Sequence, residues 1–238
     1  CNLHCLFCQN YHISQQTTKT TPITPEKLVE YCFQYEASIV AFTYSEPLMW
    51  YEFIIDSAKL LKKQGIKIVM VSNGFLNPRP FQDMLSLVDA WNIDLKAYDN
   101  DFYQKICGGQ LTPVLRNIKA VAMQSDAVLE LTNLLIPQHN DLPSQIQALV
   151  DFIADLNPDI PLHFSRYFPI YKMDVPSTSE VTLYRAAKQA REKLHYVYIG
   201  NMGMHSESNT YCPNCGNLLV ARSYLKNIRH GLTDDGHC

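Results

Sequence analysis

Short apolar runs alternate with amphipathic segments along most of this chain. The amphipathic segments repeat their apolar residues with the period of a helix, and the runs between them have the length and β-branching of strands. Such a serial alternation predicts an α/β fold, in which helical crossovers connect the strands of a parallel sheet. The predicted strands are the runs SIVAFTY (38–44), IKIVMV (66–71), DAWNIDL (89–95), AVLELTNLLI (127–136), PLHFSRY (161–167) and HYVYIG (195–200).

Caps and turn residues indicate where the predicted helices begin and end. Thr24 can cap a helix over 25–37 whose first residue is Pro25. Gly65 can end a helix over 50–64 in a left-handed conformation. The other expected elements are a loop over 72–80 (SNGFLNPRP) and helices that begin at Thr112–Pro113, cover 144–155 and end at 194.

Five or six β–α units without a GxGxxG fingerprint favour a barrel or an open partial barrel over a dinucleotide-binding sheet. The loops at the carboxyl ends of the strands form the active face of a barrel. Taken one at a time, the residues in these loops also fit ordinary turns or a surface ion pair. Their coincidence at successive strand ends indicates a functional site, and they are Ser45, Glu46, Pro47, Ser72, Asn73, Gly74, Asp94, Lys96, 137–141 and Arg166.

The two ends of the chain depart from the β–α pattern. The segment CNLHCLFCQN (1–10) precedes the first predicted helix, so we expect a first barrel strand upstream of Cys1. Residues 201–238 have no helical period and carry a CPNCG knuckle. We therefore expect a barrel domain over 1–200 and a small cysteine-containing ribbon over 201–238 that continues beyond Cys238.

Composition narrows the class of protein. The 238 residues are 47% hydrophobic and 18% charged, as in a globular protein with a sizeable core. A net charge of −3 argues against a nucleic-acid partner held by bulk electrostatics, and we interpret the basic stretch from Arg222 to Arg229 as a solvated face. Because no apolar run approaches the roughly 18 residues of a membrane span, none is expected.

Eight cysteines gather mostly at the two ends of the chain. Close clusters in a large chain indicate metal or cluster ligands in a reducing compartment, so we expect a cytoplasmic protein. Cys32 falls inside a predicted helix and is interpreted as a small buried hydrophobe. Cys107 precedes Gly108–Gly109 in a predicted turn, where we also expect a structural role.

The spacing C-x3-C-x2-C of Cys1, Cys5 and Cys8 allows three chemistries. Three thiolates on a tight loop can hold three irons of a cubane cluster and leave the fourth iron open. Zinc is the second possibility, with His4 or His12 as the fourth ligand. A disulfide is the third, although it would leave an odd thiol. The spacing favours an iron–sulfur cluster over a zinc site, and at this point both kinds of site are still open.

Near the C-terminus, Cys212 and Cys215 form a C-x2-C knuckle and Cys238 follows 22 residues later. This two-plus-one pattern indicates a second, structural metal site for zinc or iron. The fourth ligand is expected beyond Cys238 or from His205 or His237. A redox-active C-x2-C pair is the alternative.

Several motifs together carry a family resemblance. A C-x3-C-x2-C loop with an aromatic residue, Phe7, before its third cysteine resembles the signature of radical S-adenosylmethionine (radical SAM) enzymes. Over nearly the whole chain, the resemblance is more specifically to the AmmeMemoRadiSam-system radical SAM enzymes. The stretches that carry this narrower resemblance are AFTYSEPLMWYEF, VSNGF, NIDLKAY, PLHFSRYFPIYKMDVP and YIGNMGMHSESNTYCPNCG. Those enzymes are relatives of the pyruvate formate-lyase activating enzyme. The resemblance implies a partial (β/α)6 TIM-type barrel with a small zinc-ribbon-like C-terminal appendage.

The resemblance also implies roles for the loop residues. Cys1, Cys5 and Cys8 would hold a [4Fe-4S] cluster, with SAM on its open iron. The cation of Lys96 would be the counter-ion of the SAM carboxylate, since Asp94 and Lys96 match the DLK element of the activating enzymes. The remaining SAM contacts implied by the resemblance are Phe7 at the adenine, Ser45, Glu46 and Pro47 at the amino group, Ser72, Asn73 and Gly74 at the ribose or methionyl end, and His163 and Arg166 at SAM or the substrate. Ser45-Glu46-Pro47 departs from the usual Gly-Gly-Glu of the superfamily.

The implied reaction is reductive cleavage of SAM to methionine and a 5′-deoxyadenosyl radical, which abstracts hydrogen from a substrate that the sequence does not name. A low-potential electron donor of the flavodoxin or ferredoxin type is the implied partner, and Memo-type and AMMECR-type proteins or a protein substrate are further expected partners. Activation of a glycyl-radical enzyme is an alternative reaction. A two-site zinc-binding module is the alternative from a different class of protein.

Overall fold

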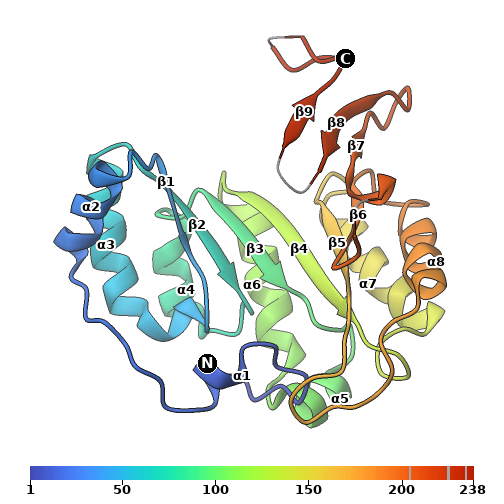
Figure 1. The fold of residues 1–238 in the computed structure, drawn as a ribbon, viewed down its shortest axis with the longest axis horizontal. Helices are drawn as coiled ribbons and strands as arrows, with labels where there is room; N and C mark the ends of the chain where they lie inside the picture. Colours follow the sequence, from blue (N-terminus) through green and yellow to red (C-terminus); the bar gives the residue numbers. More distant parts are fainter. Residues whose placement is uncertain (204, 224–225, 234) are drawn as a thin grey trace. The chain divides into compact units, whose positions relative to one another are not determined.

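The computed structural model describes residues 1–203, 205–223, 226–233 and 235–238. The fold is α/β, and six parallel strands follow one another in the sheet in the order β1-β2-β3-β4-β5-β6 (Figure 1). A dinucleotide-binding sheet reverses its strand order at a switch point, whereas this order runs on without reversal, as in a barrel. The expectation of a parallel α/β sheet of the partial-barrel kind is confirmed.

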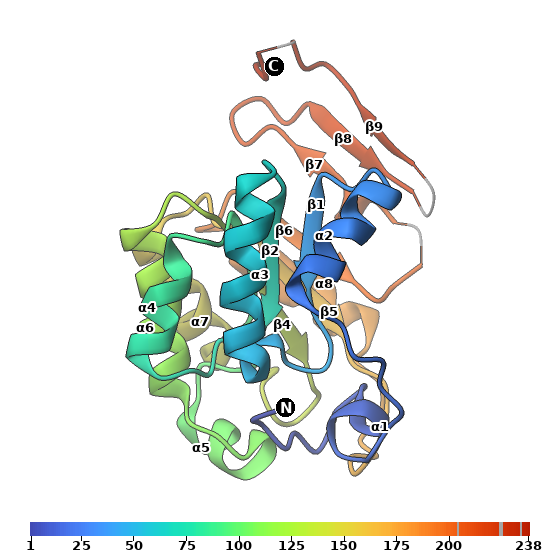
Figure 2. The ribbon, with the colours of Figure 1, turned by 90° about the vertical axis from the view of Figure 1, so that its left-hand side faces the viewer.

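The chain divides into two compact units. The first comprises residues 1–130 and 169–174, and the second comprises residues 131–168 and 175–238. In the first unit, Figure 1 and Figure 2 show α3, α4 and α6 on one side of strands β1 to β3. Its elements are α1 (Tyr11–Ser14), α2 (Pro25–Gln34), β1 (Ile39–Phe42), η1 (Pro47–Trp50), α3 (Tyr51–Lys63), β2 (Lys67–Ser72), α4 (Pro78–Leu85), β3 (Ala90–Asp94), α5 (Asn100–Phe102), η2 (Tyr103–Cys107) and α6 (Leu111–Gln124).

The predicted helix boundaries hold where a cap was visible. The hydroxyl of Thr24 accepts a hydrogen bond from the amide of Lys27 at 3.2 Å, which satisfies one of the free N–H groups at the start of α2. Gly65 has a φ of +71°, the left-handed conformation that ends a helix. Helix α2 ends at Gln34, three residues earlier than expected.

The segment after β2 corrects one prediction. Residues 72–80 were expected to form a loop, but α4 begins at Pro78 and continues to Leu85. Prolines are tolerated in the first turn of a helix, where the missing N–H has no partner inside the helix anyway. Phe81, Met84 and Leu85 then bury one face of the helix. Cys107 likewise ends a short π-helix, η2, instead of lying in a simple turn.

The second unit repeats the β–α pattern. Strand β4 pairs in parallel with β5 through the register Leu131–Leu162, and β5 pairs with β6 through Leu162–Val197. Thr178 ties the loop after β5 back to this unit, because its hydroxyl donates to the carbonyl of Leu135. The elements of this part of the chain are β4 (Val128–Leu135), which begins in the first unit, α7 (Pro143–Leu156), β5 (Leu162–Arg166), α8 (Glu180–Ala190) and β6 (Val197–Gly200).

Residues beyond β6 form a small antiparallel sheet, as expected for a ribbon. After η3 (Ser206–Ser208), strands β7 (Thr210–Tyr211), β8 (Leu218–Arg222) and β9 (Asn227–Arg229) pair in the order β7-β8-β9. Whether residues 201–238 are a separate domain remains a prediction. Within the described part of the chain, no helix combines the length and apolar character needed to cross a membrane.

Candidate active site

Glu46 organises the carboxyl ends of β1 and β2. Its side chain is 4% exposed, and its carboxylate accepts hydrogen bonds from the hydroxyl of Ser72 at 2.8 Å and from the amides of Asn73 at 2.8 Å and Leu48 at 3.1 Å. Burial raises the pKa of Glu46, while these hydrogen bonds act in the opposite direction. A buried acceptor with three donors holds the loop after β2 in one conformation.

Asn73 connects this loop to the N-terminal cysteines. Its side-chain N–H group donates to the Asn2 side chain at 2.8 Å and points at the Cys1 sulfur at 3.8 Å. Its side-chain oxygen accepts from the amide of Phe75 at 2.8 Å, and Asn2 donates to the Phe75 carbonyl at 2.5 Å. The cysteine loop is therefore attached to the end of β2 by side-chain amides.

Lys96 lies at the end of β3 beside the same loop. Its ammonium forms an ion pair with Asp94 at 3.1 Å and lies 5.8 Å from the centre of the Phe7 ring, a cation–π contact. The Lys96 side chain is only 15% exposed. Burial alone would lower the pKa of Lys96, but the charge of Asp94, followed by that of Cys5, keeps it above its usual value. Lys96 is thus a cation under all ordinary conditions.

Cys5 and Cys107 contact each other beside this cation. A hydrogen bond from Cys107 lowers the pKa of the Cys5 thiol to about 7; burial opposes this shift, and the charge of Lys96 adds to it. The pKa of Cys107 is raised correspondingly, first by the same hydrogen bond and then by burial. Cys5 is therefore the more acidic thiol of this pair, and Cys107 donates the hydrogen bond.

The backbone of the cysteine loop packs directly on η2. The amide of His4 donates to the carbonyl of Cys107 at 2.8 Å, and the amide of Leu6 donates to the carbonyl of Ile106 at 2.9 Å. A methyl group at Gly109 would overlap the end of the Leu3 side chain, which would have to move to accommodate it. The loop is a fixed part of the first unit.

Cys8 completes the predicted cysteine set. Its sulfur lies 3.2 Å from the hydroxyl of Ser14, at the end of α1. Cys1, Cys5 and Cys8 are all free thiols. Among the described residues, the three sulfurs do not form a group whose ligand atoms all lie within 4.8 Å of one another.

The predicted residues at the end of β5 belong to the second unit. The ring of His163 stacks on Tyr198 with a centroid distance of 5.0 Å. The guanidinium of Arg166 donates to the Thr178 carbonyl at 2.9 Å and lies 5.1 Å from the Phe168 ring centre. Both side chains have protein partners within their own unit, which is consistent with a packing role.

The C-terminal cysteines come together as predicted. The sulfur of Cys238 lies 3.2 Å from that of Cys212 and 3.9 Å from that of Cys215. Hydrogen bonds from the amide of Cys215, and then from the Cys238 thiol, lower the pKa of Cys212 to about 7. Among the described residues, no histidine joins the group of three whose ligand atoms all lie within 4.8 Å of one another.

Two neighbours of the cysteine loop were not predicted as site residues. Cys107 contacts Cys5, and the phenol oxygen of Tyr103 accepts a hydrogen bond from the backbone amide of Lys96 at 3.1 Å. Both lie on η2, about a hundred residues away from the loop along the chain. The pair Gly108–Gly109 was the available signal, because adjacent glycines permit a close backbone approach.

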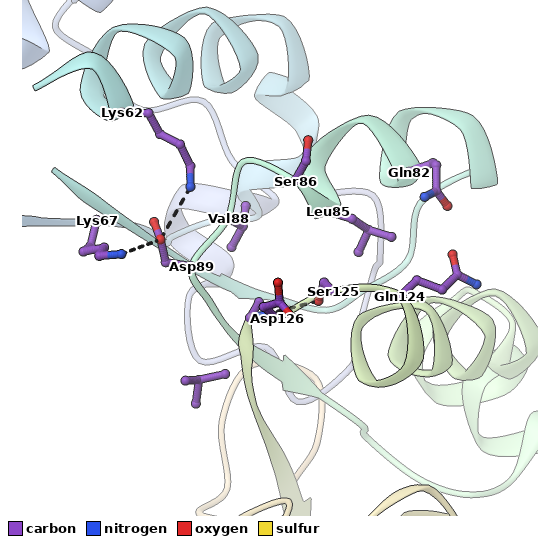
Figure 3. A pocket seen from close by; sticks show the side chains of 12 residues that line it. Lys62, Lys67, Gln82, Leu85, Ser86, Val88, Asp89, Gln124, Ser125 and Asp126 are labelled. Atoms are coloured by element: carbon purple, nitrogen blue, oxygen red, sulfur yellow. Dashed lines mark hydrogen bonds and ion pairs between the residues drawn. The ribbon is translucent and has the colours of Figure 1, made fainter. Parts of the chain in front are cut away.

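A groove lies at the amino ends of strands β2, β3 and β4, the ends opposite to the cysteine loop. It has a volume of about 920 Å³, and Figure 3 shows Lys62 and Lys67 pointing at Asp89 on its wall. Asp89 also accepts from the amide of Ile68 at 2.9 Å, and its ion pairs with the two lysines measure 3.5 and 3.1 Å. These charges are paired with one another at the amino ends of the strands, where a barrel does not carry its active site.

The cysteine loop and the polar strand ends define a class of protein. The sequence matches the Radical SAM superfamily over residues 1–153. This chain belongs to that superfamily and is a radical SAM enzyme, and membership implies a [4Fe-4S] cluster and SAM.

The chain is similar in sequence to several individual proteins. The chain is 42% identical over 235 residues to the uncharacterized protein MJ0808 of Methanocaldococcus jannaschii, covering 96% of this chain and 69% of that protein. It is 27% identical to a pyruvate formate-lyase-activating enzyme of Staphylococcus epidermidis, over 66% of this chain and 67% of that one.

Solved structures of other proteins share the fold of this chain. A domain of a pyruvate-formate lyase-activating enzyme from Bacteroides vulgatus superposes with a TM-score of 0.59 at 26% identity, covering 68% of this chain and 98% of that domain. Streptococcus suis SuiB bound to S-adenosylmethionine shares the fold, with a TM-score of 0.65 at 16% identity over 90% of this chain and 51% of its own.

Proposed function

We propose that Cys1, Cys5 and Cys8 hold three irons of a [4Fe-4S] cluster and that SAM occupies the fourth. The observation that carries this proposal is the attachment of a free three-thiol loop to the ends of β2 and β3, through Asn73 to Asn2 and through Lys96 to Phe7. Each sulfur has a polar neighbour, as hydrogen-bonded cluster thiolates require.

The chain's own residues orient the reaction. When bound and reduced, the cluster supplies the electron that cleaves SAM to methionine and a 5′-deoxyadenosyl radical, which abstracts hydrogen from the substrate. Lys96 offers a permanently charged, nearly buried ammonium to the SAM carboxylate. Glu46 holds Ser72 and Asn73 in place at the edge of the site, so their positions need no reorganisation when SAM binds. Phe7, beneath the ammonium of Lys96, remains the candidate adenine contact.

Two versions of this function differ in substrate. Activation of a glycyl-radical enzyme draws support from the pyruvate formate-lyase-activating enzymes among the relatives. Membership in the AmmeMemoRadiSam group, with Memo-type and AMMECR-type partners, draws support from HFSRY on β5 and from NTYCPNCG at the start of the ribbon. Both motifs lie outside residues 1–153, the part that the superfamily match covers. We favour the second version because it accounts for these residues, and a flavodoxin or ferredoxin is the electron donor in either.

Anaerobic reconstitution with iron and sulfide tests the cluster. Wild-type protein should turn brown, bind about four irons per chain at the loop, and release 5′-deoxyadenosine from SAM when a reductant is added. Cys5→Ala should lose both properties. Cys32→Ala is the matched control, since Cys32 is equally buried but lies on α2, and it should retain them.

Colourless protein with stoichiometric zinc at Cys1, Cys5 and Cys8 would instead establish the two-site zinc-binding module. The two enzyme versions separate in a second assay. Incubating the loaded enzyme and SAM with a glycyl-radical enzyme should produce a glycyl radical signal by electron paramagnetic resonance only if the activating version is right.

A further inference from the structure

The C-terminal ribbon lacks an apolar core of its own. Among the described residues from 201 onward, Cys212 is the single buried one, at 6% exposure. All three residues of β9 are exposed, and none in β7 or β8 is buried. A three-stranded sheet of this size, whose apolar residues on β8 are only partly buried, gains little burial to offset the entropy of ordering its chain.

Cys212, the buried residue among those described from 201 onward, has its sulfur close to those of two other cysteines. Cys212 and Cys215 flank the turn between β7 and β8, and Cys238 reaches them from beyond β9. The turn is a tight knuckle: the amide of Cys212 donates to Asn217 at 2.8 Å, and the amide of Gly216 donates back to Cys212 at 2.9 Å. Gly216 has a φ of +73°, the left-handed conformation that favours glycine.

We propose that Cys212, Cys215 and Cys238 bind one Zn²⁺ and that this ion replaces the missing core of the ribbon. All three sulfurs lie within 4.8 Å of one another and all three are free thiols. Soft thiolate ligands at tetrahedral separations suit zinc, which is bound more tightly than Fe²⁺ by the same donors.

Binding involves no redox step. Each thiol that becomes a ligand releases one proton to solvent, and the zinc ion keeps its charge. Three thiolates leave one position of a tetrahedral ion for a further donor. The ion links the β7–β8 turn to the segment after β9, so its binding free energy contributes directly to the folding of the ribbon.

Metal analysis of the full chain tests the site. Protein purified anaerobically should carry about one zinc ion per chain, and replacement by Co²⁺ should give the near-ultraviolet sulfur-to-cobalt absorption of a thiolate site. Cys215→Ser should lose both signals. A variant with Cys1, Cys5 and Cys8 all changed to Ala should lose iron and keep zinc, so the two metal sites are distinguished. Zinc content unaffected by Cys215→Ser, or a Cys212–Cys215 disulfide in metal-free protein, would overturn the proposal.

Hydrogen exchange tests the structural role without a mutation. Removing zinc from wild-type protein with a chelator should accelerate exchange of the β7 and β8 amides at least tenfold, while the amides of β2 and β3 keep their protection. Unchanged protection of β7 and β8 in the metal-free protein would show that the ribbon folds without the ion, and would contradict the proposal.

Discussion

The side-chain amide of Asn73 points at the Cys1 sulfur from 3.8 Å and donates to Asn2 at 2.8 Å. Asn73 is itself held by Glu46, which accepts a hydrogen bond from its backbone amide. A buried carboxylate on the loop after β1 thus positions an N–H group beside a candidate cluster ligand. This chain of contacts runs through three segments that are far apart in the sequence.

Asn73→Ala should lower the reduction potential of the reconstituted cluster. An N–H group beside a thiolate favours the more negative, reduced state, so its removal makes reduction harder. A hydrogen bond contributes about 1 kcal/mol, which for one electron corresponds to roughly 40 mV. A redox titration followed by electron paramagnetic resonance measures the shift.

The control for this variant is Asn117→Ala. Asn117 donates to the carbonyls of Gly74 and Leu76, so its loss loosens the same segment without touching Cys1. The potential of Asn117→Ala should match wild type. An equal shift in both variants would assign the effect to loop disorder.

Glu46→Gln should show how the buried Glu46 carboxyl group makes the stability of the folded protein depend on pH. Because burial raises the pKa of Glu46 in the folded protein, the folded state binds the proton more tightly than the unfolded state does. The stability that protonated Glu46 contributes to the wild-type protein is then fully present below the pKa of Glu46 in the unfolded state, and it is lost as the pH rises through the pKa of Glu46 in the folded state. The melting temperature of wild type minus that of Glu46→Gln should shrink as the pH rises above the ordinary glutamate pKa of 4.5, and a difference that grows with pH would contradict this assignment.

Lys96→Met should weaken SAM binding about 10- to 150-fold. A hydrogen bond between two charged groups in a nearly buried site contributes roughly 1.5–3 kcal/mol, and methionine keeps the apolar stem over Phe7 while removing the charge. Isothermal titration of the reconstituted protein with SAM measures the loss. Lys105→Met is the control, because Lys105 pairs with Asp101 on an exposed surface and should leave the affinity unchanged.

Gly109→Ala should impair iron loading. A methyl group at Gly109 meets the Leu3 side chain, and relieving that overlap costs about 1–3 kcal/mol by displacing the cysteine loop from η2. Gly65→Ala is strained through its positive φ but has open space around it. Iron per chain after reconstitution should fall in the first variant and remain at the wild-type level in the second.

Local signals accounted for much of the fold. Thr24 and Gly65 mark the ends of their helices because capping depends on a few neighbouring residues. The alternation of strands and helices predicted the parallel sheet, because a helix between two strands serves as the crossover that parallel strands need. Helix α4 was missed because two prolines near its start resemble a loop, and only the burial of Phe81 and Met84 against the rest of the unit makes it a helix.

The sequence by itself determined the chemistry available at this site, because the spacing of Cys1, Cys5 and Cys8 and the residues at the strand ends are local patterns. Only the tertiary structure decided which partners those residues have. Cys107 faces Cys5, and Asn73 faces Cys1, across separations of 102 and 72 residues. Contacts of that range depend on how parallel strands and their crossovers bring distant loops to one edge, and no short pattern in the sequence encodes that arrangement.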